Sequence, residues 1–493
     1  MNRTLKKFLL LALLAFAGQA GSADLVQILR DAFANDAQYA SARAARDAGL
    51  EALPQGRAAL LPTIGASAST QYNDFDINFR GALPASSRAG NTNAITFSLS
   101  QPLFNRNNLL LYREAEFKVA QAQALFGQAT QDLIVRVSQA YFDVLASQDN
   151  LAFIQAQKNA ISEQLAQAKR NFEVGTTTIT DTHEAQARYD LATSQEIAAD
   201  NDLEIKKRAL QQIIGKFPEP LSPLKPSVNI SLPKPATMDE WASAAEAQNY
   251  PVRAQEAAQE IALREIERIR AGHLPTLNLF GNVGRNSQNV SASGASNTAS
   301  DTDSVIIGLQ LAIPIYAGGS VSSQVRQAIS NREKARQDLE FSRRTAANAA
   351  RQAFLGVTNG VAQVSALEAA LTSSQSALDS NKLGYEVGVR INIDVLNAQQ
   401  QVFSTQRDLA RARYDTIVNG LKLKAAAGSL SEVDVEEINR MLGSEAAPAP
   451  APASHFSPRR ESPEPIRPAR IDAPVLRMIS SFSHRAAAMA SRE

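Results

Sequence analysis

Residues 171–186 read NFEVGTTTITDTHEAQ, and residues 384–399 read GYEVGVRINIDVLNAQ. Both stretches carry Glu-Val-Gly, then an Asp six residues after the Gly, and then Ala-Gln. Gly175 and Gly388 are 213 residues apart. A glycine followed closely by a new polar start is typical of a turn that ends one helix and begins another. The sequence therefore predicts two helical hairpins built on one plan.

The same offset recurs along most of the chain. Leu-Pro-Thr at 61–63, for example, returns at 274–276. A period of this length indicates a duplicated domain, because solenoid units repeat every 20–50 residues or so. We expect two structural repeats, at residues 24–215 and 237–443, joined by a linker at 216–236.

Each repeat contains a long helical segment before its glycine turn and a shorter one after it. Residues 109–174 contain one glycine and no proline, and their apolar residues step by three and four, the spacing of a bundle or coiled-coil helix. A helix of about 65 residues is roughly 100 Å long. We expect the four helices at about 109–174, 182–214, 320–387 and 395–427.

Strands are predicted before each long helix. In TDSVIIGLQLAIPIY (302–316), for example, apolar residues alternate with mostly small or polar ones. The predicted strands lie at about 63–72, 93–104, 276–284 and 304–316. Their lengths suit tilted strands through an outer membrane, although an ordinary half-buried sheet would show the same alternation.

Polar segments between the paired strands favour the membrane interpretation. Residues 73–92 and 285–302 are polar and contain glycine, and we expect them to form loops. Four strands cannot close a barrel, which needs about eight. Because lipid does not tolerate unpaired strand edges, we expect several chains to contribute to one barrel.

Composition excludes several classes of protein. The 493 residues include no cysteine, which excludes disulfides, thiol catalysis and lipid attached to an N-terminal cysteine. The net charge of +1 gives no electrostatic reason to expect nucleic acid. None of the four histidines forms a metal-binding pair, and no nucleotide-binding or nucleophile motif occurs. The sequence predicts no enzyme, no cofactor and no metal site.

The two ends of the chain differ from the repeats. Residues 1–23 combine a basic start, a short apolar stretch and small residues, which predicts a cleaved secretory signal, with an uncleaved anchor as the alternative. Residues 444–493 are rich in Pro, Ala and Arg, which predicts a disordered, solvated tail. Contact of its arginines with acidic lipid or peptidoglycan is the alternative.

The residues around the two turns have a structural explanation. Asp181 followed by Glu184 has the spacing of a capping box, and Asp394 can cap the second helix in the same way. Gly175 and Gly388 can supply the positive φ that ends the preceding helix.

The two copies also differ where capping explains nothing. The second repeat carries Tyr385 before its turn and Arg390 after it, whereas Phe172 stands in the first repeat at the position of Tyr385. A tyrosine and an arginine can bond to the acid and hydroxyl of the other tip, Asp181 and Thr180. Such bonds would hold the hairpins together, and breaking them would let the hairpins separate.

Five stretches carry a resemblance to a known family: YFDVL (141–145), QARYDLA (186–192), GHLPTLNL (272–279), LAIPIYAGG (311–319) and GYEVGVRINIDVLNAQQ (384–400). In this order and on the 213-residue repeat they are specific, and over roughly residues 24–440 the chain resembles the TolC family of outer-membrane channel-tunnels. The resemblance implies an α+β membrane protein that forms a homotrimer. Its twelve-stranded β-barrel in the outer membrane of a Gram-negative bacterium takes four strands from each protomer. The barrel continues into a periplasmic α-helical barrel of coiled-coil helices.

The resemblance also implies roles for residues at the tips. The tip-closing ties of the family correspond to Tyr385 with Asp181 and to Arg390 with Thr180. Its acidic constriction ring corresponds to Asp394, and a second ring acid is replaced here by Asn397, which implies a weaker electronegative constriction.

The implied function is an exit duct that passes drugs, type I secreted proteins or both. A periplasmic adaptor and an inner-membrane pump of the ABC or RND type are the implied partners, along with outer-membrane lipid. A secreted helical filament or adaptor without a pore is the alternative. The sequence does not identify the cargo.

Overall fold

The computed structural model describes residues 23–443, apart from positions 79, 81–85, 177, 226, 227, 229 and 293–297. These residues all belong to one unit, Met1–Ala447. The predicted signal, except for Ala23, and the predicted tail at 444–493 lie outside the described residues.

The described residues form two repeats, and each repeat runs from short helices through two strands to two long helices. The first repeat contains α2 (Leu25–Asn35), α3 (Ala37–Leu50), α4 (Ala52–Ala58), β1 (Thr63–Ile77), β2 (Ser86–Phe104), α5 (Arg106–Glu173) and α6 (Ile179–Ile214). The second contains α7 (Met238–Gln248), α8 (Tyr250–Arg270), a short 3-10 helix (Ala271–His273), β3 (Thr276–Ala292), β4 (Thr298–Ala312), α9 (Ser320–Glu386), α10 (Asn392–Ala426) and α11 (Glu432–Asn439). β1 and β3 begin 213 residues apart, as do α6 and α10.

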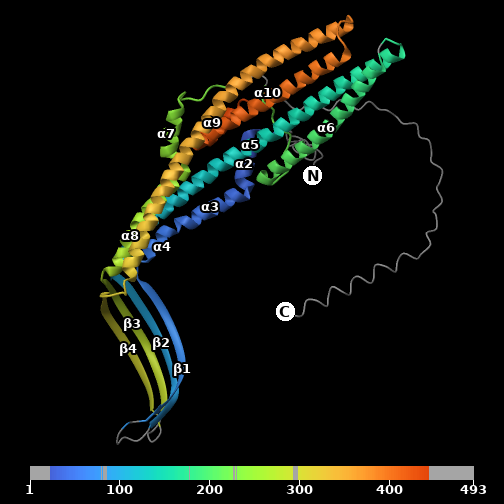
Figure 1. Ribbon diagram of the computed structural model, residues 1–493. Helices are drawn as coiled ribbons and strands as arrows, with labels where there is room; N and C mark the ends of the chain where they lie inside the picture. The colour runs from blue at the N-terminus through green and yellow to red at the C-terminus, as the bar shows by residue number, and fades with distance from the viewer. Residues whose placement is uncertain are drawn as a thin grey trace, which may run out of the picture. The chain divides into compact units, whose positions relative to one another are not determined.

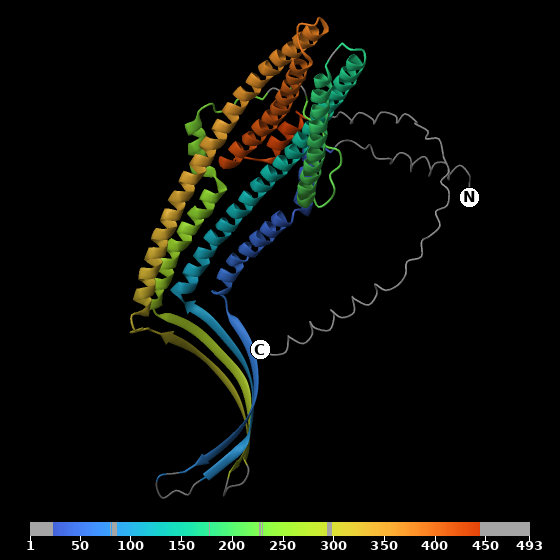
Figure 2. The same cartoon turned by 45° about the vertical axis from the view of Figure 1, so that its right-hand side comes forward.

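Two long hairpins, α5–α6 and α9–α10, dominate the helical part. α5 packs along α6, α8 and α10, and α9 packs along α7, α8 and α10. The turns of both hairpins lie at the end of this unit opposite the sheet, in both views (Figures 1 and 2). Within the described ranges, no helix combines the length and the apolar character needed to cross a membrane.

The four strands form one antiparallel sheet in the order β1-β2-β3-β4. The predicted mixture of helices with four strands per chain is therefore confirmed. The strands are 15 to 19 residues long, so they extend further than predicted, and much of the predicted loops 73–92 and 285–302 is strand. These segments lack alternating apolar residues, but backbone hydrogen bonds pair them regardless of side chain, as in Asn286↔Thr302. β4 ends at Ala312, short of the predicted 316, where Pro314 lacks the N–H needed for strand pairing.

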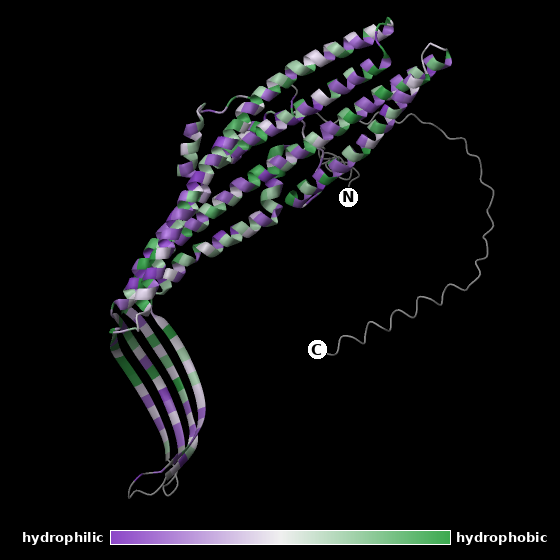
Figure 3. Cartoon of the chain, in the orientation of Figure 1, coloured by the Kyte–Doolittle hydropathy of each residue, from purple (hydrophilic) through white to green (hydrophobic). Residues whose placement is uncertain are grey.

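The two faces of the sheet differ in polarity. Leu279 lies opposite Leu309, and Val283 lies opposite both Phe97 and Val305, so these side chains share one face. The other face carries mostly small and polar residues: Ser67, Thr96, Ser98, Asn278, Asn282, Ser304 and Gln310. The apolar residues gather in the half of the sheet nearer the helices, where Figure 3 is greenest. Arg285 lies on the apolar face beyond Val283, on the side away from the helices. It is 3.5 Å from both Asp301 and Asp303, and this charged group marks the end of the apolar band.

The largest apolar core surrounds the middle of α5, where α2, α6, α10 and α11 contribute buried side chains. Phe142 stacks on Tyr414 of α10, with ring centroids 5.5 Å apart. The buried Tyr141 hydroxyl donates to the Ser222 carbonyl at 2.8 Å, and burial is the main cause that raises the pKa of Tyr141. This core joins the two hairpins at their base.

Candidate functional site

The hairpin turns are built around two glycines with positive φ. Gly175 has φ 76° and Gly388 has φ 79°. In each turn the second amide after Val174 or Val387 bonds back to the end of the helix, from Thr176 to the Asn171 carbonyl and from Val389 to the Gly384 carbonyl, both at 2.8 Å. A Cβ added at either glycine would meet nothing within 4 Å. Backbone conformation, rather than space, therefore requires glycine at these turns.

Helix starts after the turns lie three residues earlier than predicted. α6 begins at Ile179 with Thr178 as its N-cap, and Asp181 is the third helical residue. One carboxylate oxygen of Asp181 accepts from the Thr178 amide and hydroxyl, both at 3.3 Å. The predicted N-cap role of Asp181, with Glu184 as its partner, is wrong because Thr178 and Asp181 already complete a capping box one turn earlier.

Asp394 occupies the equivalent third position of α10, and the N-cap there is Ile391. The predicted N-cap role of Asp394 is therefore also wrong. The Asp394 carboxylate lies 3.6 Å from the guanidinium of Arg390, four residues earlier in the chain. Its charge is thus partly offset within its own hairpin.

The predicted ties between the two tips do not form inside one protomer. Thr180 is exposed, and Tyr385 is half-buried against Leu378 and Val395 of its own hairpin. Among the described residues, no hydrogen bond or ion pair joins Tyr385 to Asp181 or Arg390 to Thr180. These two ties remain predictions about the assembled protein.

A different residue links the hairpins near the tips. The Arg188 guanidinium of α6 donates to the Gln400 side-chain oxygen at 2.7 Å and to the Asn397 side-chain oxygen at 3.0 Å, both on α10. The family resemblance implied a constriction role for Asn397, whereas the sequence did not point to Arg188 or Gln400. The sequence did contain one signal. Gln401 is the residue equivalent to Arg188 in the second repeat, so the two copies differ here as they do at Tyr385.

An apolar cluster lies between the hairpins at the level of Arg188. Ile161 of α5, Ala192 of α6 and Leu396 of α10 are each at most 5% exposed and pack together. Tyr189 and Ile393 cover the cluster. The cluster holds α6 and α10 at the separation that Arg188 spans.

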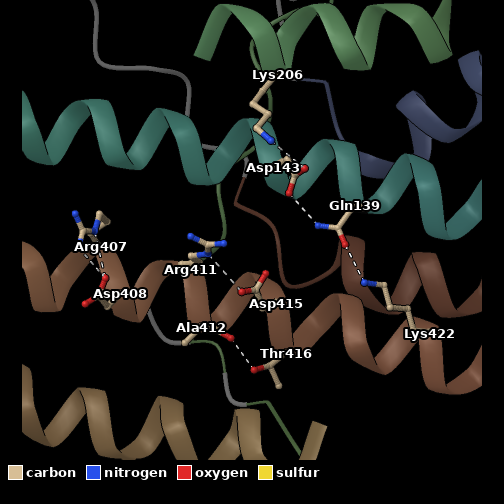
Figure 4. Close-up of polar contacts among 10 residues, drawn as sticks. All are labelled: Gln139, Asp143, Lys206, Arg407, Asp408, Arg411, Ala412, Asp415, Thr416 and Lys422. Carbon is tan, nitrogen blue, oxygen red and sulfur yellow. Dashed lines mark hydrogen bonds and ion pairs between the residues drawn. The ribbon is translucent and has the colours of Figure 1, made fainter. Parts of the chain in front are cut away.

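A series of polar contacts links the helices at the base of the hairpins (Figure 4). Lys206 of α6 lies 3.6 Å from Asp143 of α5, Gln139 donates to Asp143 at 2.9 Å, and Lys422 of α10 donates to Gln139 at 3.1 Å. These four side chains connect three helices in series. Together with the aromatic core, they hold the two hairpins against each other at their base.

A half-buried carboxylate reinforces the same base. The Tyr414 hydroxyl donates to Asp149 of α5 at 2.6 Å. Burial raises the pKa of Asp149, and the bond from Tyr414 opposes that rise. Burial beside this carboxylate also raises the pKa of Tyr414. The pair ties α5 to α10.

The tips themselves present apolar side chains to solvent. Val174 is 73% exposed and Val389 is 79% exposed, and Val387 and Ile391 are also exposed. In the described part of the chain, no group of three or more His, Asp or Glu side chains is arranged to hold a metal ion. The arrangement offers contact surfaces and a charged link between the hairpins.

Comparison with known proteins matches both repeats. The family described as outer membrane efflux protein matches residues 28–216 and 241–429. The chain is 34% identical over 443 residues to the outer membrane protein TolC of Vibrio cholerae, which covers 90% of this chain and 99% of that protein. It is 33% identical to the alkaline protease secretion protein AprF of Pseudomonas aeruginosa, covering 85% of this chain and 87% of that protein.

Solved structures share the fold at lower identity. The CmeC outer membrane channel of Campylobacter jejuni superposes with a TM-score of 0.70 at 18% identity, covering 85% of this chain and 90% of that one. The outer membrane protein VceC of Vibrio cholerae gives a TM-score of 0.68 at 17% identity, covering 82% of this chain and 96% of that one.

Proposed function

The chain belongs to the outer membrane efflux protein family, and we propose that it is the outer-membrane exit duct of a three-part export system with a gate at its hairpin tips. It is an outer-membrane channel of the efflux and type I secretion class. The family consists of transport channels, not enzymes. The relatives support the channel and not the secreted filament considered from the sequence.

The sheet carries this proposal. One face exposes a band of large apolar side chains, with Val305, Ile307, Leu309 and Leu311 each at least 60% exposed. β1 and β4 are the edges of the sheet, and neither has a second strand partner in the described residues. In lipid these edges must be paired, and three copies of the sheet make a closed barrel of twelve strands. A homotrimer is therefore the assembly we propose.

The hairpin tips form the gate of this duct. Tyr385, Arg390, Thr180 and Asp181 lie beside the two turns, on positions that face solvent or are half-buried in one protomer. In the trimer we place the ties Tyr385–Asp181 and Arg390–Thr180 between neighbouring hairpins, with Asp394 around the axis. The contacts that hold the hairpins together at their base suit hairpins that part at one end only.

Membership of the family supports a proposal about partners and cargo. The exposed valines at the tips suit docking of a periplasmic adaptor, which would connect the duct to an inner-membrane pump of the ABC or RND type. Among the relatives, AprF is named for secretion of alkaline protease. The cargo of this duct comprises drugs, type I secreted proteins or both.

Single-channel recording in planar bilayers tests the gate. Tyr385→Phe combined with Arg390→Ser removes both proposed ties, so the small conductance of the closed trimer should rise. Arg336→Ser is the control, because Arg336 pairs with Glu333 of its own helix α9. Purified trimers that carry no ion current would overturn the duct, and an unchanged conductance of the double variant would overturn the gate ties.

A further inference from the structure

We propose that Arg188, Asn397 and Gln400 form a latch that holds the two hairpins of each protomer together, and that Arg188 makes the closed tip less selective for cations. This inference rests on the proposed gate, because it takes Asp394 and Asn397 to lie at the constriction. We name these three residues the Arg188 latch.

The geometry of the latch is that of a fork. The planar guanidinium places two N–H groups on amide oxygens that belong to successive turns of α10, at 2.7 Å and 3.0 Å. Arginine is suited to such two-point contacts, whereas the compact ammonium group of lysine is not. Across the described ranges, no other hydrogen bond or ion pair joins α6 directly to α10. The latch is therefore the polar link that must break when these helices separate.

The packing around the latch keeps it in register. The cluster of Ile161, Ala192 and Leu396 holds α6 against α10 at the same level. Leu396 is the neighbour of Asn397 in sequence, so α10 presents an apolar residue to the cluster and the adjacent amide to Arg188. Asn397 and Gln400 are exposed, and the latch is therefore accessible to water and ions.

Charge is the second consequence of the latch. Both partners of Arg188 are neutral amides, and no carboxylate of the described residues lies within 4.0 Å of its guanidinium. Asn397 stands one turn beyond Asp394, whose carboxylate is 3.6 Å from Arg390. Lys158 and Glu196, two turns further along the hairpins, pair with each other at 2.5 Å. At the level proposed for the constriction each protomer thus brings Arg188 and Arg390, with Asp394 of α10 and with Asp181 and Glu184 of α6.

The two arginines reduce the negative charge expected at this level from sequence. An acidic ring attracts cations into a narrow space, but here Arg390 offsets Asp394 and Arg188 adds a positive charge. The closed tip should therefore admit anions more readily than an uncompensated acidic ring would, and multivalent cations should block it weakly.

Two substitutions at one position separate the link from the charge. Arg188→Lys keeps the charge and loses the fork, so closed-state conductance should rise while the cation-to-anion permeability ratio stays near that of the parent. Arg188→Gln loses both, so conductance should rise and the permeability ratio should increase at least about twofold. The estimate assumes three lost charges acting at about one Debye length, ~10 Å at 0.1 M salt.

Asn397→Asp supplies the opposite change at the same contact. It gives Arg188 a carboxylate partner, so the latch should tighten, closed-state conductance should fall and the permeability ratio should shift toward cations. Arg208→Gln is the matched control, because Arg208 is exposed on α6, where it bonds to Glu204 and Gln211 of its own helix and lies 5.0 Å from the centre of the Phe217 ring. Among the described residues it has no hydrogen bond to α10. Arg208→Gln should leave both quantities unchanged.

Reversal potentials in a salt gradient and closed-state conductance are measured on trimers verified by gel migration. If Arg188→Gln matches the parent in both, while Tyr385→Phe with Arg390→Ser still raises conductance, the latch is overturned and the proposed gate stands. If the double variant also leaves conductance unchanged, the tip gate itself is overturned. A higher conductance of Arg188→Gln without a change in selectivity would overturn the charge role alone.

Discussion

A single arginine placed on the outward face of β4 should prevent the protein from entering the membrane. Leu309 is 63% exposed in one protomer, and its neighbours on the same face, Ile307 and Leu311, are 76% and 60% exposed. The apolar band ends at Asp303, which pairs with Arg285. Leu309 therefore lies near the middle of the band, which corresponds to the centre of the hydrocarbon core of the membrane.

The cost of Leu309→Arg follows from this depth. A cationic side chain facing lipid near the midplane destabilises an outer-membrane barrel by about 2–4 kcal/mol. Since a trimer carries three copies, the assembled barrel loses roughly 6–12 kcal/mol. Val305 lies two residues from Asp303 on the same face of β4, close to the interface between lipid and water. Val305→Arg should therefore destabilise the barrel by only about 0–1 kcal/mol per copy.

Gln310→Arg is the matched control for Leu309→Arg. Gln310 is next in the chain but points to the other face, where it lies opposite Asn278. Folding into lipid vesicles, followed by gel migration with and without heating, should show loss of the folded band for Leu309→Arg and its retention for Gln310→Arg. Equal folding yields for these two variants would refute the assignment of the faces.

Three further expectations concern the assembly, the turns and the buried base. Crosslinking in native membranes should yield trimers, and a folded monomer in mild detergent would contradict the shared barrel. Gly388→Ala should lower the free energy of unfolding by about 1–2 kcal/mol, because φ is 79° there. Gly420→Ala, inside α10 with no atom within 4 Å of the added Cβ, should raise the free energy of unfolding by up to about 1 kcal/mol. Equal changes for the two variants in urea titration would refute the turn geometry. Since burial raises the pKa of Asp149, the folded state holds that proton more tightly, and stability should fall as pH rises from about 4, the unfolded value, to the raised pKa. Asp149→Asn should remove this fall in stability. Tyr414→Phe should lower the free energy of unfolding by about 1–3 kcal/mol at neutral pH. If Asp149→Asn and the parent show the same dependence of stability on pH, the raised pKa of Asp149 is refuted.

The duplication and the types of element were accessible from sequence because they depend on local patterns. The position of Gly175 and Gly388 between two helical segments is enough to predict a turn at each. Steps of three and four along 109–174 indicate a helix whichever partner covers it. The alternation around Leu309 likewise predicts one apolar face of a strand.

Sequence was a weaker guide to where elements begin and end. The outer parts of the strands are polar on both faces, so only the pairing of backbone with backbone, such as Asn286 with Thr302, shows that they are strands. Both Thr178 and Asp181 can cap a helix, and the earlier position prevails because it completes the box with Asp181 itself.

The latch was decided by tertiary structure alone. Arg188 lies 209 and 212 residues from its partners Asn397 and Gln400, and no local periodicity relates them. Their meeting depends on how closely the two hairpins pack, which the cluster of Ile161, Ala192 and Leu396 determines. Periodicity predicts which side of a helix is apolar, but the neighbour of a polar side chain depends on how the hairpins pack against each other.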